Sequence, residues 1–129
     1  MKHTDKARVG AIGEKLVTRF LEEKGFEILD VNYRKPWGEI DIVAQRDGVL
    51  RFVEVKAMQM TGASRDYRPE DHVGLWKKNR LSRVIRTYII EKRIDENTDF
   101  DIVVAAVLLD FGNKKAKIRL VENVLLGDK

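Results

Sequence analysis

Two acids and an amine stand at a spacing that could form a site for a divalent cation. Asp41 and Glu54 are separated by twelve residues, and Lys56 follows Glu54 with one residue between them. Two carboxylates in one site repel each other, so the pair either shares a proton or holds a cation between its members. Carboxylate oxygens suit a hard divalent ion such as Mg²⁺ or Mn²⁺. An ammonium group beside them can contact a phosphate oxygen or a water molecule.

A β-hairpin is expected to bring the two acids together. Residues 39–44 and 50–56 alternate in character, and Asp47-Gly48 between them is a strong signal for a two-residue turn. With these two residues as the turn, Asp41 faces Glu54 in a non-hydrogen-bonded pair. The β-carbons of such a pair lie ~4.5–5.5 Å apart.

The same register predicts a second pair, Glu39 opposite Lys56. We interpret Glu39 as the cross-strand ion-pair partner of Lys56 rather than as a further acid of the site. Lys56 lies on the same face of its strand as Glu54, because strand residues two apart share a face. Charged residues at alternate positions of a hairpin also fit a plain solvated face, and the pattern alone leaves that alternative open.

The remaining segments predict an α/β fold. One helix shows an apolar stripe that ends near Gly25, and a second shows a stripe of aliphatic residues. The order helix, three strands, helix, two strands indicates a mixed sheet flanked by helices. The expected elements are a helix at 5–24, a strand at 26–33, the hairpin strands, a long mobile loop at 57–71, a helix at 72–93, and strands at 101–109 and 116–121.

Composition limits the function classes. The 129 residues suit one domain, and the formal net charge of +4 allows an acidic partner without requiring one. The absence of cysteine excludes disulfides, thiol nucleophiles and Cys-ligated metal centres. The two histidines, His3 and His72, lack the spacing of a zinc site. No apolar run approaches the ~18 residues of a membrane span, so we expect a soluble cytoplasmic protein.

Several segments together resemble the YraN family of predicted endonucleases. This family belongs to the PD-(D/E)xK, restriction-endonuclease-like superfamily, which includes archaeal Holliday junction resolvases. The resemblance covers roughly residues 9–107. It rests on Gly13-Glu14, Gly38-Glu39-Ile40-Asp41-Ile42-Val43-Ala44, Phe52-Val53-Glu54-Val55-Lys56 and Phe100-Asp101-Ile102-Val103.

The resemblance implies a restriction-endonuclease-like core of about five strands and Mg²⁺-dependent (or Mn²⁺-dependent) hydrolysis of phosphodiester bonds. It makes Asp41 and Glu54 metal ligands, with the carbonyl of Val55 as a third. It has Lys56 orient or deprotonate the attacking water and stabilise charge on the phosphate. Glu14, on the first helix, would hold a metal-bound water.

The second predicted helix carries basic residues opposite its apolar stripe. Either they form a solvated face or they contact DNA phosphates without reading the bases. The position of Lys77 is commonly basic in the family that the chain resembles, which makes Lys77 the strongest single candidate. The predicted nucleic-acid contacts are Lys77, Lys78, Arg80 and Arg83. We interpret the two tryptophans, Trp37 and Trp76, as packing residues.

The sequence therefore predicts a single-domain, Mg²⁺-dependent endonuclease acting on DNA, including branched or damaged DNA. The first alternative is a non-catalytic nucleic-acid-binding module on the same fold, which would need no metal. The second is a domain that binds an acidic metabolite or a protein, with the hairpin charges merely solvated. A homodimer would match paired cuts in a branched substrate.

Overall fold

The structure is a computed structural model that describes residues 3–60 and 75–121, with side chains for residues 6–60 and 80–121. Strand β3 continues through Gln59, so residues 57–59, predicted as the start of a loop, belong to a strand. Residues 61–71 of that predicted loop lie outside the described residues. The elements are α1 (His3–Glu23), β1 (Glu27–Lys35), β2 (Gly38–Arg46), β3 (Val49–Gln59), α2 (Leu75–Glu91), β4 (Phe100–Asp110) and β5 (Lys115–Val121).

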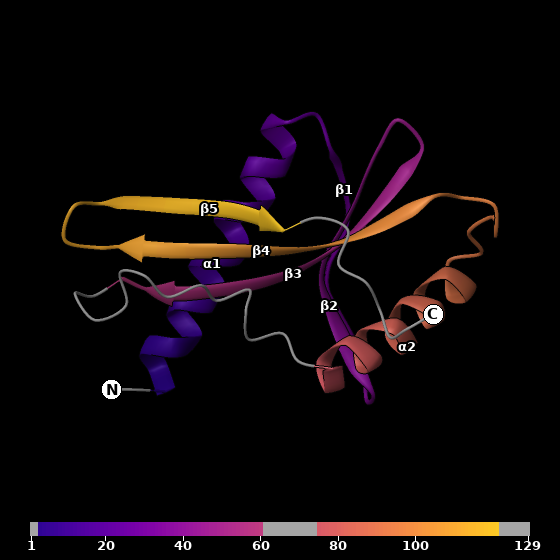
Figure 1. Ribbon diagram of the computed structural model, residues 1–129, viewed down its shortest axis with the longest axis horizontal. Helices are drawn as coiled ribbons and strands as arrows, with labels where there is room; N and C mark the ends of the chain where they lie inside the picture. Colours follow the sequence, from indigo (N-terminus) through magenta and orange to yellow (C-terminus); the bar gives the residue numbers. More distant parts are fainter. Residues whose placement is uncertain (1–2, 61–74, 122–129) are drawn as a thin grey trace.

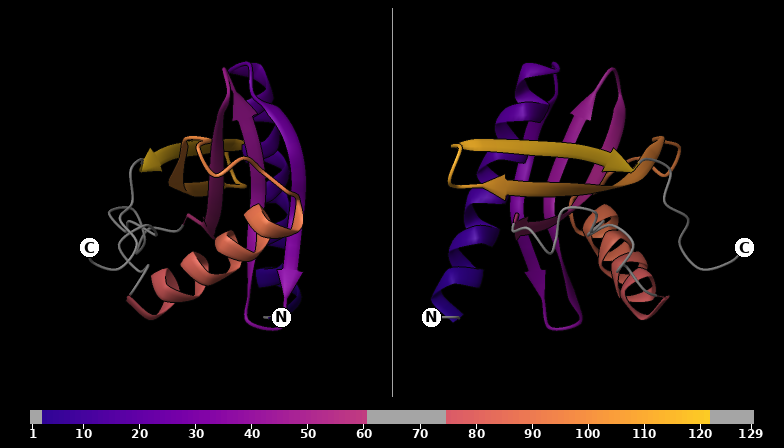
Figure 2. Two further views of the ribbon diagram at one scale, coloured as in Figure 1. Left: turned by 90° about the vertical axis from the view of Figure 1, so that its right-hand side faces the viewer. Right: turned by 60° about the vertical axis from the view of Figure 1, so that its left-hand side comes forward.

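The five strands form one sheet in the order β1-β2-β3-β4-β5. The pair β3–β4 is parallel and the other neighbouring pairs are antiparallel, so the sheet is mixed. Helices α1 and α2 lie on opposite sides of the sheet (Figures 1 and 2). The predicted α/β architecture, a mixed five-stranded sheet flanked by helices, is confirmed. Within the described residues, neither helix is long and apolar enough to cross a membrane.

The core has two layers because alternate residues of β3 point to opposite faces of the sheet. Val53 belongs to the layer that α1 covers with Val17 and Leu21, and all three side chains are fully buried. Phe52 belongs to the other layer and packs edge-to-face on Tyr88 of α2. Burying a side chain of this size stabilises the fold by ~1.5–3 kcal/mol. Strand β3 is therefore fixed from both sides.

The turn between β2 and β3 has the predicted residues and the predicted register. Asp47 and Gly48 both have positive φ, 53° and 79°, as a type I′ turn requires. The ladder runs from the pair Arg46–Val49 to the pair Ile42–Val53, as a two-residue turn dictates. It ends there, and beyond this point β2 and β3 separate. Figure 1 shows the strong twist that sets β2 at a steep angle to β4 and β5.

Two glycines let the helices lie close to the sheet. A β-carbon at Gly13 of α1 would lie 2.6 Å from the β-carbon of Ala57 on β3. A β-carbon at Gly38, the first residue of β2, would lie 3.4 Å from the carbonyl oxygen of Arg80 on α2. Both contacts are on the side of the molecule where β2 and β3 separate. The glycines thus bring α1 and α2 to the acids of the hairpin.

Candidate metal centre

Asp41 occupies the point where the β2–β3 ladder stops. Its side chain is 5% exposed, and its Oδ2 accepts a hydrogen bond of 2.7 Å from the main-chain N–H of Val55. In a continued antiparallel ladder the next hydrogen-bonded pair after Ile42–Val53 would be Ile40–Val55. The carboxylate of Asp41 therefore takes a donor that the neighbouring strand would otherwise satisfy.

The carbonyl group of Val55 faces the same gap. In an antiparallel pair a residue directs its N–H and its C=O toward the same neighbouring strand. Because the N–H of Val55 points to Asp41, its carbonyl oxygen points to the space that β2 vacates. A carboxylate and a main-chain oxygen therefore border one opening between the strands.

Glu54 adds a second buried carboxylate beside this opening. Its side chain is 4% exposed. Burial raises the pKa of Asp41 to about 7, and the negative charge of Glu54 contributes to the rise, whereas the hydrogen bond from Val55 opposes it. The carboxyl group of Asp41 therefore keeps its proton to a higher pH than an exposed aspartate does. We predicted that the two acids form a pair of the ladder, but the ladder ends one pair before them. They are still close enough for the charge of Glu54 to act on Asp41.

Lys56 lies next to Glu54 rather than next to Glu39. Its Nζ is 3.9 Å from Oε2 of Glu54, and its side chain is 32% exposed. The predicted Glu39–Lys56 ion pair is wrong. The strands have separated before that position, and β1 places Arg34 directly opposite Glu39, with Nε 3.0 Å from Oε1.

Glu14 reaches the same region from α1. Burial raises its pKa, the amide of Asn32 and the charge of Arg34 lower it, and the charges of Glu39 and Glu54 raise it further. The charge of Glu14 in turn raises the pKa of Asp41. The close approach of α1 at Gly13, the preceding residue, positions this acid. The structure thus brings together Glu14, Asp41, Glu54 and Lys56, as the sequence analysis grouped them.

Asn32 and Arg34 are neighbours of the site that the sequence analysis missed. Asn32 has a φ of 52° between two regular pairs of the β1–β2 ladder, Val31–Ile42 and Tyr33–Ile40. Asn adopts this left-handed conformation more readily than most residues, so an Asn within a strand pattern was the available signal. Arg34 could have been found from its place opposite Glu39 only if the register of β1 had been known.

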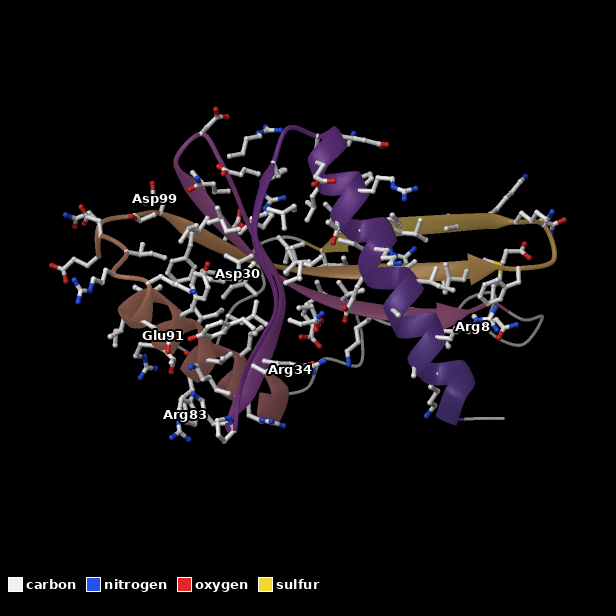
Figure 3. All side chains as sticks on the ribbon, turned by 180° about the vertical axis from the view of Figure 1, so that it is seen from behind. Arg8, Asp30, Arg34, Arg83, Glu91 and Asp99 are labelled. Atoms are coloured by element: carbon white, nitrogen blue, oxygen red, sulfur yellow. The ribbon has the colours of Figure 1, made fainter. Side chains whose placement is uncertain are left out.

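The basic residues of α2 lie beside the β1–β2 turn. Arg80 is half-buried, and its Nε donates to the carbonyl oxygen of Trp37 over 3.4 Å. The exposed Arg83 stacks its guanidinium 5.0 Å from the centre of the Trp37 ring. Figure 3 shows Arg34 and Arg83 toward the same end of the molecule. The side chains of Lys77 and Lys78 lie outside the described residues.

Trp37 and Asp101 have structural roles beside the site. Trp37 is half-buried against the layer that α2 covers, as predicted, while the side chain of Trp76 lies outside the described residues. Asp101, at the start of β4, receives two hydrogen bonds of 3.1 Å from the guanidinium of Arg51. These residues therefore support the sheet and do not enter the acidic site.

The donor set at the opening fits a hard divalent cation. Two buried carboxylates and a main-chain carbonyl are oxygen ligands, and Mg²⁺ keeps several of its own waters, so few protein ligands suffice. A cation would also remove the repulsion that raises the pKa of Asp41. Among the side chains that the structure describes, no group of three or more Asp, Glu, His or Cys residues is arranged to hold a metal.

Comparison with known proteins identifies relatives over most of the chain. The sequence profile of the family described as "Uncharacterised protein family UPF0102" matches residues 13–105. A UPF0102 protein of Alkaliphilus oremlandii is 39% identical over 119 residues, which are 90% of this chain and 96% of the relative. A UPF0102 protein of Campylobacter hominis is 34% identical over 120 residues, 92% of this chain and 95% of the relative. The matched residues include Glu14, Asp41, Glu54 and Lys56.

Proposed function

This chain belongs to the uncharacterised protein family UPF0102, the family predicted under the name YraN, and we propose that it is a metal-dependent endonuclease that hydrolyses phosphodiester bonds of DNA. One observation carries the proposal. Asp41 and Glu54 are both buried where β2 and β3 separate, and the carbonyl of Val55 faces the same opening. A fold that keeps two like charges together in its interior loses stability unless a proton or a cation neutralises part of that charge.

Each residue around the opening would have its own role in hydrolysis. Asp41, Glu54 and the carbonyl of Val55 would hold Mg²⁺ or Mn²⁺. A bound ion of this kind lowers the pKa of water and neutralises negative charge on the phosphate. Lys56, whose ammonium group is 3.9 Å from Glu54, would orient the attacking water and stabilise charge on the phosphate. Glu14 would accept a hydrogen bond from that water.

DNA is the proposed substrate because cations gather beside the acids. Arg34, Arg80 and Arg83 lie around the end of the β1–β2 hairpin, close enough to contact a backbone without reading bases. A mixed sheet flanked by helices, with the acids on its central hairpin, supports membership of the PD-(D/E)xK superfamily. The resemblance to that superfamily extends the proposal to branched or damaged DNA and to a cytoplasmic location.

Metal binding and cleavage can be tested separately. We expect isothermal titration of the purified protein with Mn²⁺ to give saturable binding that is lost in Asp41→Asn and Glu54→Gln. In Mn²⁺ the wild type should cut branched or plasmid DNA, and both variants should lose that activity. Lys56→Ala should keep the metal and cleave ~10²–10⁴-fold more slowly, the contribution typical of a group that assists proton transfer.

The matched control is Asp99→Asn, which removes an exposed carboxylate just before β4, where the main chain of Asp99 pairs with Leu50 near the start of β3. This variant should bind Mn²⁺ and cut DNA as the wild type does. Cleavage by Asp41→Asn at the wild-type rate would show that the assigned chemistry is wrong. DNA binding without metal binding or cleavage would favour the non-catalytic module instead.

A further inference from the structure

A hollow of about 250 Å³ lies between the end of the β1–β2 hairpin and α2. The described residues around it include three cations, one carboxylate, a glycine and a leucine. The lining residues are Arg34, Lys35, Gly38, Glu39, Arg80 and Leu81. Arg34 and Lys35 come from β1, and Arg80 comes from α2.

The fold holds this hollow in shape. Gly38 lets the backbone of α2 approach the hairpin, because a β-carbon there would meet the carbonyl oxygen of Arg80 at 3.4 Å and the side chain of Val84 at 3.6 Å. Arg80 is fixed by its hydrogen bond to the carbonyl of Trp37. Lys35 is fixed by Glu91, with Nζ 2.8 Å from Oε2. These positions are set before any ligand arrives, which lowers the entropy cost of binding.

Arg34 is the most adaptable cation of the hollow. Its side chain is 69% exposed and its contact is the exposed Glu39, whose side chain is 45% exposed. An exposed ion pair of this kind contributes only ~0.2–1 kcal/mol, so a stronger anion can replace the carboxylate. The planar guanidinium matches two oxygens of a phosphate group at once.

The hollow adjoins the acidic opening. Glu39 lines the hollow and stands two residues before Asp41 on β2, about 6.6 Å along a strand. Its negative charge is among the causes that raise the pKa of Asp41. The positive charge of Arg34 lowers the pKa of Glu14. A chain of phosphates could therefore occupy both places at once.

We propose that this hollow binds a phosphate group of the DNA backbone next to the phosphate that lies at Asp41 and Glu54. The proposal rests on the proposed function for its choice of DNA. In the complex, Arg34 exchanges Glu39 for phosphate oxygens, while Arg80 and Lys35 provide fixed positive charge. The negative charge of Glu39 then repels the phosphate and lowers its affinity for the hollow.

Two substitutions of opposite charge test this arrangement. Arg34→Gln should weaken the binding of a short DNA duplex about fivefold, and should lower the slope of log Kd against log salt by about 1. Glu39→Gln should strengthen binding by a few fold, because it removes the competing carboxylate. Arg19→Gln and Glu23→Gln, both exposed on α1, make the same changes in net charge elsewhere and should have smaller effects. Fluorescence anisotropy in EDTA measures binding without cleavage.

The outcomes separate this proposal from the proposed function. If Arg34→Gln and Glu39→Gln both weaken binding, their ion pair is structural and the hollow takes no phosphate. If each variant binds the duplex with the same affinity as its α1 control, or if inorganic phosphate binds as tightly as the duplex, the hollow is not a site for the DNA backbone. The predicted opposite effects in a protein that cuts no DNA would support the hollow and refute the nuclease. If the protein cuts DNA but neither variant changes DNA binding, the nuclease is supported and the phosphate site in the hollow is refuted.

Discussion

The raised pKa of Asp41 makes the stability of the metal-free protein depend on pH. Burial and the charge of Glu54 move this pKa from its ordinary 3.8 to about 7. The folded protein therefore binds the proton more tightly than the unfolded chain does, and the free energy of unfolding falls as the pH rises through this window. Because each pKa unit is worth about 1.4 kcal/mol, the full loss is about 4 kcal/mol.

Asp41→Asn isolates this contribution. The amide is uncharged and its oxygen can still accept the hydrogen bond of Val55. Urea unfolding in EDTA should find the two proteins similar near pH 4, and the variant more stable by up to about 4 kcal/mol at pH 8. Asp99→Asn, at an exposed position, should leave the pH profile of the wild type unchanged.

Addition of Mn²⁺ provides the second half of the experiment. At pH 8 a concentration ~100 times the dissociation constant should stabilise the wild type by about 2.7 kcal/mol and leave Asp41→Asn unaffected. A difference between wild type and Asp41→Asn that stays constant from pH 4 to pH 8 would refute the electrostatic reasoning. It would mean that the carboxyl group of Asp41 ionises as freely in the fold as in water.

Two further substitutions test how the site is held in place. Gly13→Ala should destabilise the protein by ~1–3 kcal/mol in urea unfolding, because the new β-carbon would lie 2.6 Å from that of Ala57. A variant as stable as the wild type would show that α1 does not approach β3 so closely. Tyr88→Phe should cost about 1.5 kcal/mol, since it removes the 2.7 Å hydrogen bond from the buried hydroxyl to Asp30; an unchanged midpoint would show that water replaces this bond without loss.

Local signals predicted much of the fold. The turn at Asp47-Gly48 depends on two residues that adopt positive φ, and the apolar stripe before Gly25 marks a helix that ends where glycine allows it. The order of helices and strands then follows from periodicity. The ends were less well placed, since β3 continues past residue 56 through Ala57, Met58 and Gln59, and the loop-forming residues, such as Gly62 and Pro69, come later in the sequence.

The residues of the candidate site were predicted better than their arrangement in space. The register that brings Asp41 near Glu54 follows from the turn, but the separation of the strands beyond Ile42–Val53 depends on the twist of the whole sheet. A local pattern does not contain that twist. The partner of Glu39 was predicted wrongly because β2 and β3 have separated before this position and β1 places Arg34 opposite it. The register of β1 includes an irregularity between Ile28 and Asp30 that no turn signal indicates.

The hydrogen bond between the N–H of Val55 and Asp41 links one backbone atom to the chemistry of the opening. Any event that alters the carboxyl group, whether a proton, an ion or a nearby phosphodiester, must alter the electron density around that amide hydrogen. The amide resonance of Val55 in a ¹⁵N-labelled sample can therefore report whether the opening is occupied, with no dye, substrate or turnover required.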